Sequence, residues 1–325
     1  MSFFIVFVFT VSTVQSISVF AQTRGKLLQK QTVQNEIELL RQKGFDRLKT
    51  GEWNQANEIF ESLIIKLPDD YLALYGNGLA LFNLRRIAEA DKNISKAVGL
   101  LSEKRINENL LADSLVLSAL ILAAQNKNDE AIEKLNRAVK IAPVNFDANF
   151  SLARAYFGNR EFADAAKYFK ISTTLHPDHL QAKFFLATAL ERSGNLQEAL
   201  SEYRAVVKQN ENYADGNAGL GVLLINLEGE KSVEGLNALQ KAVTLNGNLY
   251  EARVTLGKTL LRLNRLNEAL ENLKKAAELA PENPEPHFQL SIAYRKLGKK
   301  AETAAETEIV KKIHAARRGV TENKK

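Results

Sequence analysis

Residues 146–179 read FDANFSLARAYFGNREFADAAKYFKISTTLHPDH, and residues 180–213 read LQAKFFLATALERSGNLQEALSEYRAVVKQNENY. The first segment has Ala153, Ala165 and Phe169 at positions 8, 20 and 24, and the second has Ala, Ala and Tyr at the same positions. Small residues let two helices approach closely, and a ring beside them fills the space that is left. Each segment therefore predicts a pair of helices that packs against the next pair.

The spacing of 34 residues recurs along most of the chain. Gly44 and Gly78 repeat it near the start, and Gly257 and Ser291 near the end. Proline at position 32 stops the second helix of a unit because it lacks an N–H group and clashes with the preceding turn. We place the starts of the units at Ile37, Tyr71, Ala112, Phe146, Leu180, Ala214, Tyr250 and Pro284.

This pattern resembles the tetratricopeptide repeat (TPR), a helix–turn–helix unit of about 34 residues. The resemblance implies an all-α fold, a right-handed α-solenoid of about eight repeats over residues 37–317 with a C-terminal capping helix. We expect residues 22–36 to lead into the first helix and residues 318–325 to form a disordered basic tail. Two insertions, near residues 102–108 and 229–232, are expected to bulge as loops without breaking the stack.

The N-terminus has the character of a targeting segment. Residues 1–21 carry no charge, and residues 3–9 are continuously apolar. Val19 and Ala21 stand at the −3 and −1 positions of a small-residue cleavage site, which is typical of a secretory signal peptide. A retained membrane anchor and a wrongly assigned start are the alternatives, because no basic residue precedes the apolar run. We expect an exported protein, periplasmic or extracellular, or else a membrane-anchored one.

Composition argues against several functions. The absence of cysteine rules out disulfides and thiolate chemistry. The net charge of +6 is spread among interspersed acids and bases, so we expect no nucleic-acid partner. The four histidines do not cluster as metal ligands, and the glycines at 216, 219 and 221 lack the strand that a cofactor loop requires. We predict no cofactor, no metal and no catalytic residues, hence no enzyme.

Acidic residues recur at position 2 of the units. At the start of a helix an acid stabilises free N–H groups and the helix dipole, so we interpret the row as helix capping rather than as a cation site. Its members are Glu38, Asp113, Asp147, Asp215, Glu251 and Glu285.

In the TPR family the first helix of each unit lines a concave groove. The resemblance thus implies a peptide-binding groove with aromatic side chains at positions 5 and 12 and basic ones at positions 9, 12 and 13. An alternative is that the rings pack between units and the bases only aid solubility. The candidate residues are Tyr75, Phe82, Phe150, Arg154, Phe157, Phe184, Arg192, Lys258, Arg262, Phe288 and Arg295.

These features favour a non-enzymatic scaffold that binds a protein or peptide. A groove with rings and bases suits a partner segment with apolar side chains and some acids. Bacterial TPR proteins of this general type serve envelope and secretion assemblies, so we expect an exported adaptor. A membrane-anchored scaffold and a regulatory subunit of an enzyme complex are the alternatives. The sequence names neither the partner nor the oligomeric state.

Overall fold

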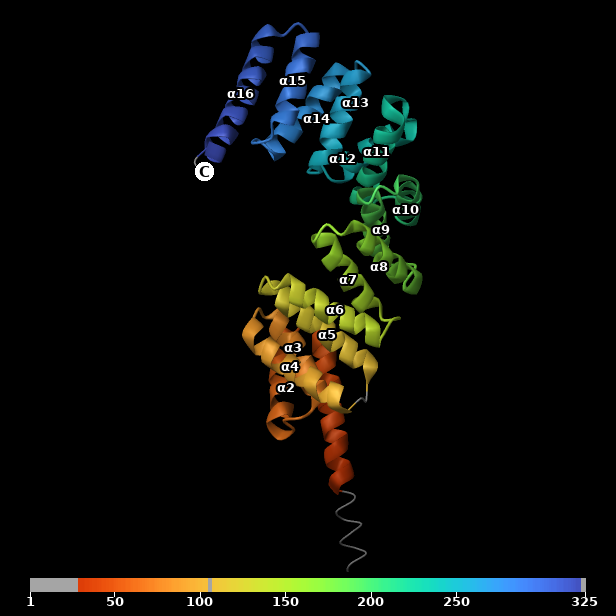
Figure 1. The fold of residues 1–325 in the computed structure, drawn as a ribbon, viewed down its shortest axis with the longest axis vertical. Coiled ribbons are helices and arrows are strands. Elements are labelled where there is room, and N and C mark those ends of the chain that lie inside the picture. Colours follow the sequence, from red (N-terminus) through yellow and green to blue (C-terminus); the bar gives the residue numbers. More distant parts are fainter. Residues whose placement is uncertain (1–28, 105–106, 323–325) are drawn as a thin grey trace, which may run out of the picture. The chain divides into compact units, whose positions relative to one another are not determined.

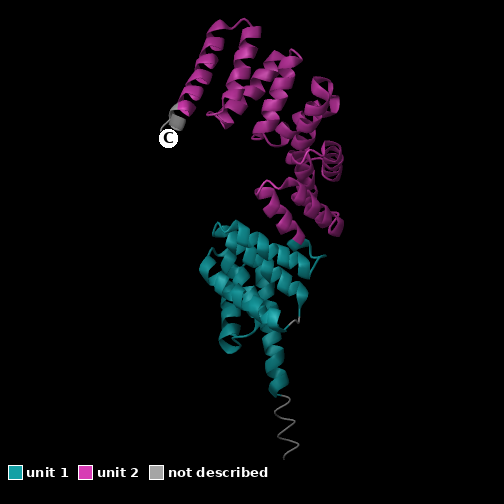
Figure 2. Cartoon of the chain, in the orientation of Figure 1, with its two compact units in different colours: residues 1–148 teal, residues 149–325 magenta. Residues whose placement is uncertain are grey.

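The computed structural model describes residues 29–104 and 107–322, and these residues form helices and turns with no strand (Figure 1). The chain divides into two compact units, residues 1–148 and residues 149–325 (Figure 2). The first unit has a helix over residues 29–49, then α2 (Trp53–Lys66), α3 (Tyr71–Asn83), α4 (Ile87–Lys104), α5 (Glu108–Ala124) and α6 (Asn128–Ile141).

α7 (Phe146–Gly158) begins in the first unit and continues into the second. The helices that follow are α8 (Phe162–Leu175), α9 (Leu180–Arg192), α10 (Leu196–Gln209), α11 (Ala214–Glu228), α12 (Val233–Leu245), α13 (Tyr250–Arg262), α14 (Leu266–Leu279), α15 (Pro284–Lys296) and α16 (Lys300–Glu322). The helices alternate as first and second members of repeats. This confirms the prediction of an all-α solenoid of the TPR type.

The unit starts predicted from the 34-residue spacing agree closely with the helix starts. Six of them are the first residues of helices, namely Tyr71, Phe146, Leu180, Ala214, Tyr250 and Pro284. The second helices α6, α8 and α14 end two residues before a proline, because the residue before proline avoids the α conformation.

The large residue at position 24 joins each repeat to the next. A Cβ added at Gly44, in the helix before α2, would lie 2.6 Å from the ring of Phe60, and one at Gly76 in α3 would lie 2.4 Å from it. Phe60 is fully buried between these two helices. Where the following repeat has Phe185 instead of glycine, the ring of Phe169 stacks on it at 5.5 Å. A ring that two helices share therefore joins the first repeat to the second and the fourth to the fifth.

The turn inside each repeat has a backbone feature that the spacing does not reveal. The residue at position 15 has a positive φ in seven repeats: Gly51, Arg85, Asn126, Arg160, Gly194, Asn264 and Gly298. Glycine adopts this left-handed conformation without strain, whereas an L side chain is disfavoured there. The turn geometry is thus kept even where the residue is arginine.

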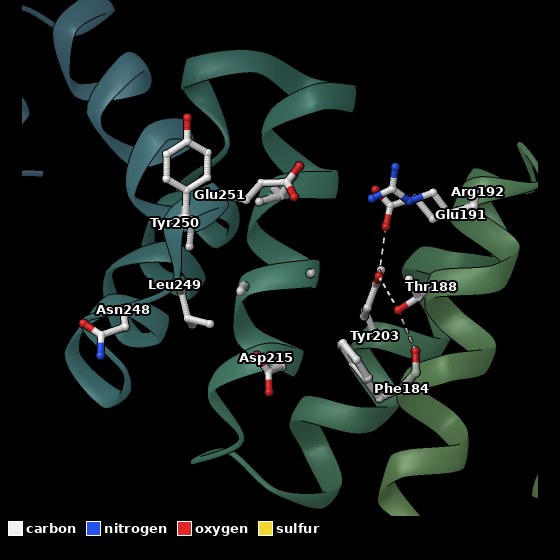
Figure 3. Close-up of a pocket in the computed structure, with 14 residues that line it drawn as sticks. Phe184, Thr188, Glu191, Arg192, Tyr203, Asp215, Asn248, Leu249, Tyr250 and Glu251 are labelled. Carbon is white, nitrogen blue, oxygen red and sulfur yellow. Dashed lines mark hydrogen bonds between the residues drawn. The ribbon is translucent and has the colours of Figure 1, made fainter. Parts of the chain in front are cut away.

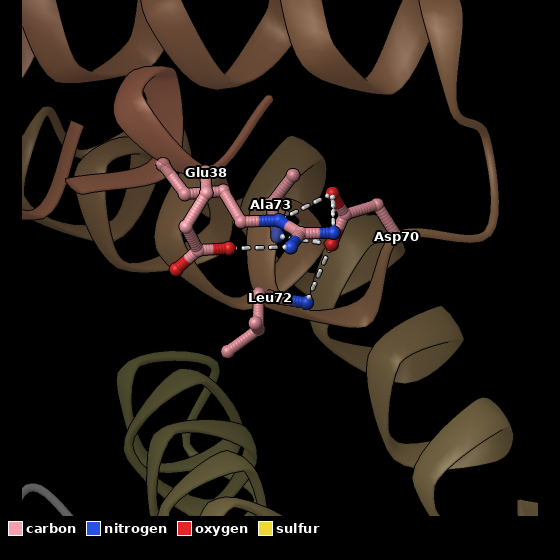
Figure 4. Close-up of polar contacts among 5 residues, drawn as sticks. Glu38, Asp70, Leu72 and Ala73 are labelled. Atoms are coloured by element: carbon pink, nitrogen blue, oxygen red, sulfur yellow. Dashed lines mark hydrogen bonds and ion pairs between the residues drawn. The ribbon is translucent and has the colours of Figure 1, made fainter. Parts of the chain in front are cut away.

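An ion pair fastens the first repeat to the second. The Arg41 guanidinium donates from Nε to Asp70 Oδ2 at 2.9 Å, and Nη2 lies 2.8 Å from the same oxygen (Figure 4). The Asp70 carboxylate also accepts from the N–H groups of Leu72 and Ala73 and so caps α3. Arg41 stands at position 5, where Tyr75 and Phe150 supply rings in other repeats.

The insertion near residues 102–108 does not form the loop that the sequence predicts. α4 continues to Lys104, and α5 begins at Glu108 with Asn107 as its N-cap, so the extra residues mostly lengthen two helices. The insertion near residues 229–232 forms the short 3₁₀ helix η1 (Gly229–Lys231).

The two ends of the chain extend the array. The helix over residues 29–49 includes part of the predicted lead-in, whereas the predicted signal segment, residues 1–21, lies outside the described residues. α16 continues to Glu322, so residues 318–322 are helical and the predicted disordered tail is wrong there. Within residues 29–104 and 107–322, no helix has the length and apolar character that a membrane crossing needs.

Candidate functional site

All eleven candidate groove residues lie on the first helices of repeats. Tyr75 and Phe82 are on α3 in the first unit. The remaining candidates belong to the second unit, on α7 (Phe150, Arg154, Phe157), α9 (Phe184, Arg192), α13 (Lys258, Arg262) and α15 (Phe288, Arg295). Within the second unit, each first helix from α9 onward packs on the next one: α9 on α11, α11 on α13 and α13 on α15. We call the surface of these four first helices the inner face.

Most of the candidate rings pack between helices. The ring of Phe150 lies 5.6 Å from that of Phe169 and 5.4 Å from the imidazole of His179. Phe184 lies 6.2 Å from Tyr203 and meets Tyr213 edge to face at 5.5 Å. These half-buried rings adjoin the core of the second unit. Their geometry accounts for them as packing residues, and Phe184 also lines a pocket.

The other candidate rings differ in exposure. Phe157 packs on Phe162 at 5.3 Å. Tyr75 and Phe82 adjoin the core of the first unit. Burial, with a smaller effect of nearby carboxylates, raises the pKa of Tyr75 to about 12. Phe288, at the same register position as Phe150, is 50% exposed. Phe288 is thus the candidate ring most available to a partner.

The candidate bases are mainly at the surface. Arg154, Arg192, Arg262 and Arg295 are exposed. Lys258 reaches the next repeat, where its Nζ lies 2.9 Å from Glu285 Oε1. Lys258 is therefore already neutralised by a residue of α15.

A pocket of about 340 Å³ opens on the inner face between α9, α11 and α13 (Figure 3). Repeat six creates it because α11 carries Ala218, Gly219 and Val222 where α9 has Phe184, Phe185 and Thr188. Small side chains on α11 leave a hollow between the two flanking helices.

Tyr203 of α10 forms part of the pocket wall and orders its polar groups. A Cβ at Gly219 would lie 2.4 Å from the Tyr203 ring, so glycine is needed for the ring to fit. The Tyr203 hydroxyl donates to Glu191 Oε2 at 2.8 Å and lies 3.1 Å from Thr188 Oγ1. Burial and the nearby Glu191 raise the pKa of Tyr203, and burial raises that of Glu191.

Two further carboxylates, Asp215 and Glu251, line the same pocket. Both belong to the position-2 row, and both lie in the first turn of a helix, as the capping interpretation predicts. That interpretation fails for Glu38 and Asp113, because both lie inside helices that begin earlier. Glu38 instead accepts from Arg41 Nη1 at 2.9 Å, and Asp113 accepts from Asn145 Nδ2 at 2.8 Å. Glu191 was not among the predicted groove residues, although it occupies position 12, where Phe82 and Phe157 were predicted to line the groove.

The histidines and the glycines of α11, which could suggest metal or cofactor binding, have structural roles. His179 caps α9 by accepting from the Ala182 N–H at 3.1 Å, and His287 Nδ1 lies 2.7 Å from Glu306 Oε2. The described residues contain no group of three His, Cys, Asp or Glu side chains placed to hold a metal ion. All three glycines of the α11 string lie against neighbouring atoms, so their role is close packing.

A second depression, of about 760 Å³, lies between α10, α11 and α12. Four of its five charged groups form two pairs, and the fifth is Lys208. Arg204 forms a bidentate ion pair with Glu234, with N–O distances of 2.9 and 2.6 Å. The Nζ atom of Lys241 lies 3.3 Å from Glu211 Oε2. Most of the charge on this surface is therefore compensated from within, in contrast to the pocket between α9, α11 and α13.

Models of the tetratricopeptide repeat match this chain at residues 42–91 and 150–216, and models of the TPR repeat match at residues 119–159 and 257–298. Together they span more than half of the chain, which belongs to the tetratricopeptide repeat proteins. Proteins of this family bind other proteins, and the chain is a protein-interaction scaffold in that general sense.

Curated relatives are distant and longer. The chain is 20% identical over 269 residues to anaphase-promoting complex subunit 3 of Schizosaccharomyces pombe, covering 82% of this chain and 39% of the relative. It is 23% identical to the DnaJ protein P58IPK homolog of Arabidopsis thaliana, covering 67% and 46%. The chain therefore spans less than half of the length of either relative.

Solved structures show the same fold. The C-terminal part of a TPR repeat-containing protein of Cytophaga hutchinsonii gives a TM-score of 0.59 at 14% identity, covering 77% of this chain and 99% of that one. The APC/C hetero-tetramer Cut9-Hcn1 gives 0.56 at 17% identity, covering 77% and 48%. Pseudomonas aeruginosa pilF gives 0.56 at 14% identity, covering 64% and 94%.

Proposed function

We propose that this chain is a non-enzymatic, exported TPR adaptor that holds a peptide or helix of a protein partner on the inner face of its second unit. The observation that supports this most is the pocket between α9, α11 and α13, a concave site with apolar and charged walls. Partner segments are recognised by such sites through a few side chains that enter pockets.

The test is capture of a partner by the full-length chain in its native host, with chemical cross-linking before lysis. Ala218→Phe fills the pocket with the ring that position 5 has in repeats four and five. Ala163→Phe on α8 is the matched control, because it adds the same ring at an exposed position outside the inner face. Circular dichroism establishes that both variants are folded.

We expect a partner that the parent and Ala163→Phe capture and that Ala218→Phe loses. A partner that all three proteins retain would place the interaction elsewhere and contradict the proposal.

The proposed compartment is the envelope or the secretory route. It is supported by the uncharged, apolar character of residues 1–21 and the small residues Val19 and Ala21. Mass spectrometry of the mature N-terminus tests it. A chain that starts at Gln22 supports export, an intact segment in membranes supports the anchored alternative, and an intact chain in the cytoplasm contradicts both.

A further inference from the structure

The pocket on the inner face gathers three carboxylates from three successive repeats. Glu191 stands at the end of α9, Asp215 at the start of α11 and Glu251 at the start of α13 (Figure 3). Asp215 and Glu251 share position 2 of their units, whereas Glu191 occupies position 12, so the position-2 pattern does not predict this set. We call this site the acidic pocket.

The charges of the acidic pocket are not balanced by its own walls. Arg192 is the one basic residue among the described residues that line it. In the described part of the chain, neither Asp215 nor Glu251 lies within ion-pair distance of a base. This differs from the neighbouring Glu285, which pairs with Lys258, and from the depression beside α12, where acids and bases pair with each other.

The partial burial of Glu191 makes this excess of negative charge unfavourable. The side chain is half-buried, and within residues 29–104 and 107–322 its one hydrogen bond comes from the neutral Tyr203 hydroxyl. A carboxylate withdrawn from water is destabilised in its charged form unless a cation or several donors compensate. A cation that entered the pocket would supply this compensation.

The remaining walls suit a guest with an apolar stem. Ala218, Val222 and Leu249 line the pocket beside the ring of Phe184.

We propose that the acidic pocket receives an arginine side chain from the partner segment, with its methylene stem against Val222 and Leu249 and its guanidinium between Glu191 and Glu251, while Asp215 adds negative charge at the other end of the pocket (Figure 3). A guanidinium presents five donors in a planar fork, so it can serve acceptors on separate helices at once. Arginine thereby matches a pocket whose facing acceptors come from α9 and α13. This inference rests on the proposed function, and at this pocket a basic side chain of the partner replaces the acidic ones that were expected beside its apolar side chains.

The experiment uses two small probes that differ in charge. N-acetyl-arginine amide is titrated into the full-length chain carrying labelled valine and leucine methyl groups, and N-acetyl-citrulline amide serves as its uncharged near-isostere. The methyl signals of Val222 and Leu249 report on the pocket directly. We expect saturable shifts at both residues with the arginine probe, and binding weaker by about tenfold or more with citrulline.

Charge-removing variants provide the second arm. Glu191→Gln, Asp215→Asn and Glu251→Gln together should abolish the arginine-induced shifts. The matched control changes three exposed carboxylates outside the pocket, Glu198→Gln, Glu228→Gln and Glu271→Gln, and should leave the shifts unchanged. Both variants alter the net charge equally, so a general electrostatic effect would weaken both.

Three results would overturn the inference: equal binding of the two probes, retained binding by the pocket variant, or no saturable shift with arginine at millimolar concentrations. None of these contradicts the proposed function, because loss of a captured partner on Ala218→Phe would still place a protein partner at the inner face.

Discussion

Replacing Asp70 tests how one side chain holds the first two repeats together. The Asp70 side chain is 2% exposed, and it both caps α3 and accepts two bonds from Arg41, whose side chain is 17% exposed. Asp70→Ala removes the cap and leaves the arginine without its main anion. Asp70→Asn preserves a side-chain acceptor for the cap, because asparagine is as good an N-cap as aspartate.

The magnitudes follow from these two roles. Loss of an N-cap costs about 0.5–2 kcal/mol, and removing one partner of a buried ion pair costs about 3–5 kcal/mol. Arg41 keeps its 2.9 Å contact with Glu38, which reduces the second cost. We therefore expect Asp70→Ala to destabilise the first unit by about 3 kcal/mol and Asp70→Asn by about half as much.

Trp53 supplies the assay, because it is the only tryptophan of the chain and packs against the core of the first unit. Its fluorescence during urea unfolding reports on that unit rather than on the whole array, which need not unfold in one step. The control is Asp69→Asn, since Asp69 is exposed and pairs only at the surface with Lys96. If Asp70→Ala unfolded at the same urea concentration as the control, the reasoning about this ion pair would be refuted.

Three further predictions concern the second unit. Gly221→Ala should cost about 1–3 kcal/mol by overpacking, since its Cβ would lie 2.9 Å from the backbone N of Leu239, which cannot turn away; a thermal melt unchanged from the parent would contradict this. Gly194→Ala should cost about 1 kcal/mol through its φ of +89° alone, because nothing lies near the added carbon; Gly158→Ala, equally open but without a positive φ, should cost nothing and is the control in the same melts. Glu191→Gln tests the raised pKa of Glu191. A carboxyl whose pKa is raised on folding destabilises the folded state as pH rises through that pKa, so the variant should be at least as stable as the parent at neutral pH, with an advantage that shrinks as pH falls through the raised pKa and is gone below the ordinary glutamate value of about 4.3. Denaturation at several pH values measures this difference, and an advantage that grows in acid would show that the sign is wrong.

The sequence predicts the array well because the repeat spacing is set by packing between neighbours. Tyr71, Phe146 and Leu180 begin helices as expected, since the small residues and the ring of each unit fix its register. The spacing does not reveal how an insertion is absorbed. The extra residues near position 104 continue α4 because they favour helix as readily as loop.

The candidate site was harder to predict, because a register position does not determine what a side chain contacts. Phe150 and Phe288 share position 5, yet Phe150 packs on Phe169 whereas Phe288 is half exposed. Arg41 occupies the same position and forms an ion pair instead. Asp215 and Glu251 were interpreted as helix-capping acids and Glu191 was not singled out, because the pocket that all three line depends on the small side chains of α11.

The central claim, that a protein partner is held on the inner face of the second unit, is tested most directly by photo-cross-linking in the native host. A photoreactive amino acid replaces Thr188, which lines the pocket, and in a parallel strain it replaces Ala163 on α8. The account predicts a discrete cross-linked protein from position 188 and none from position 163. A cross-link that forms only at position 163, or equally at both, would contradict it.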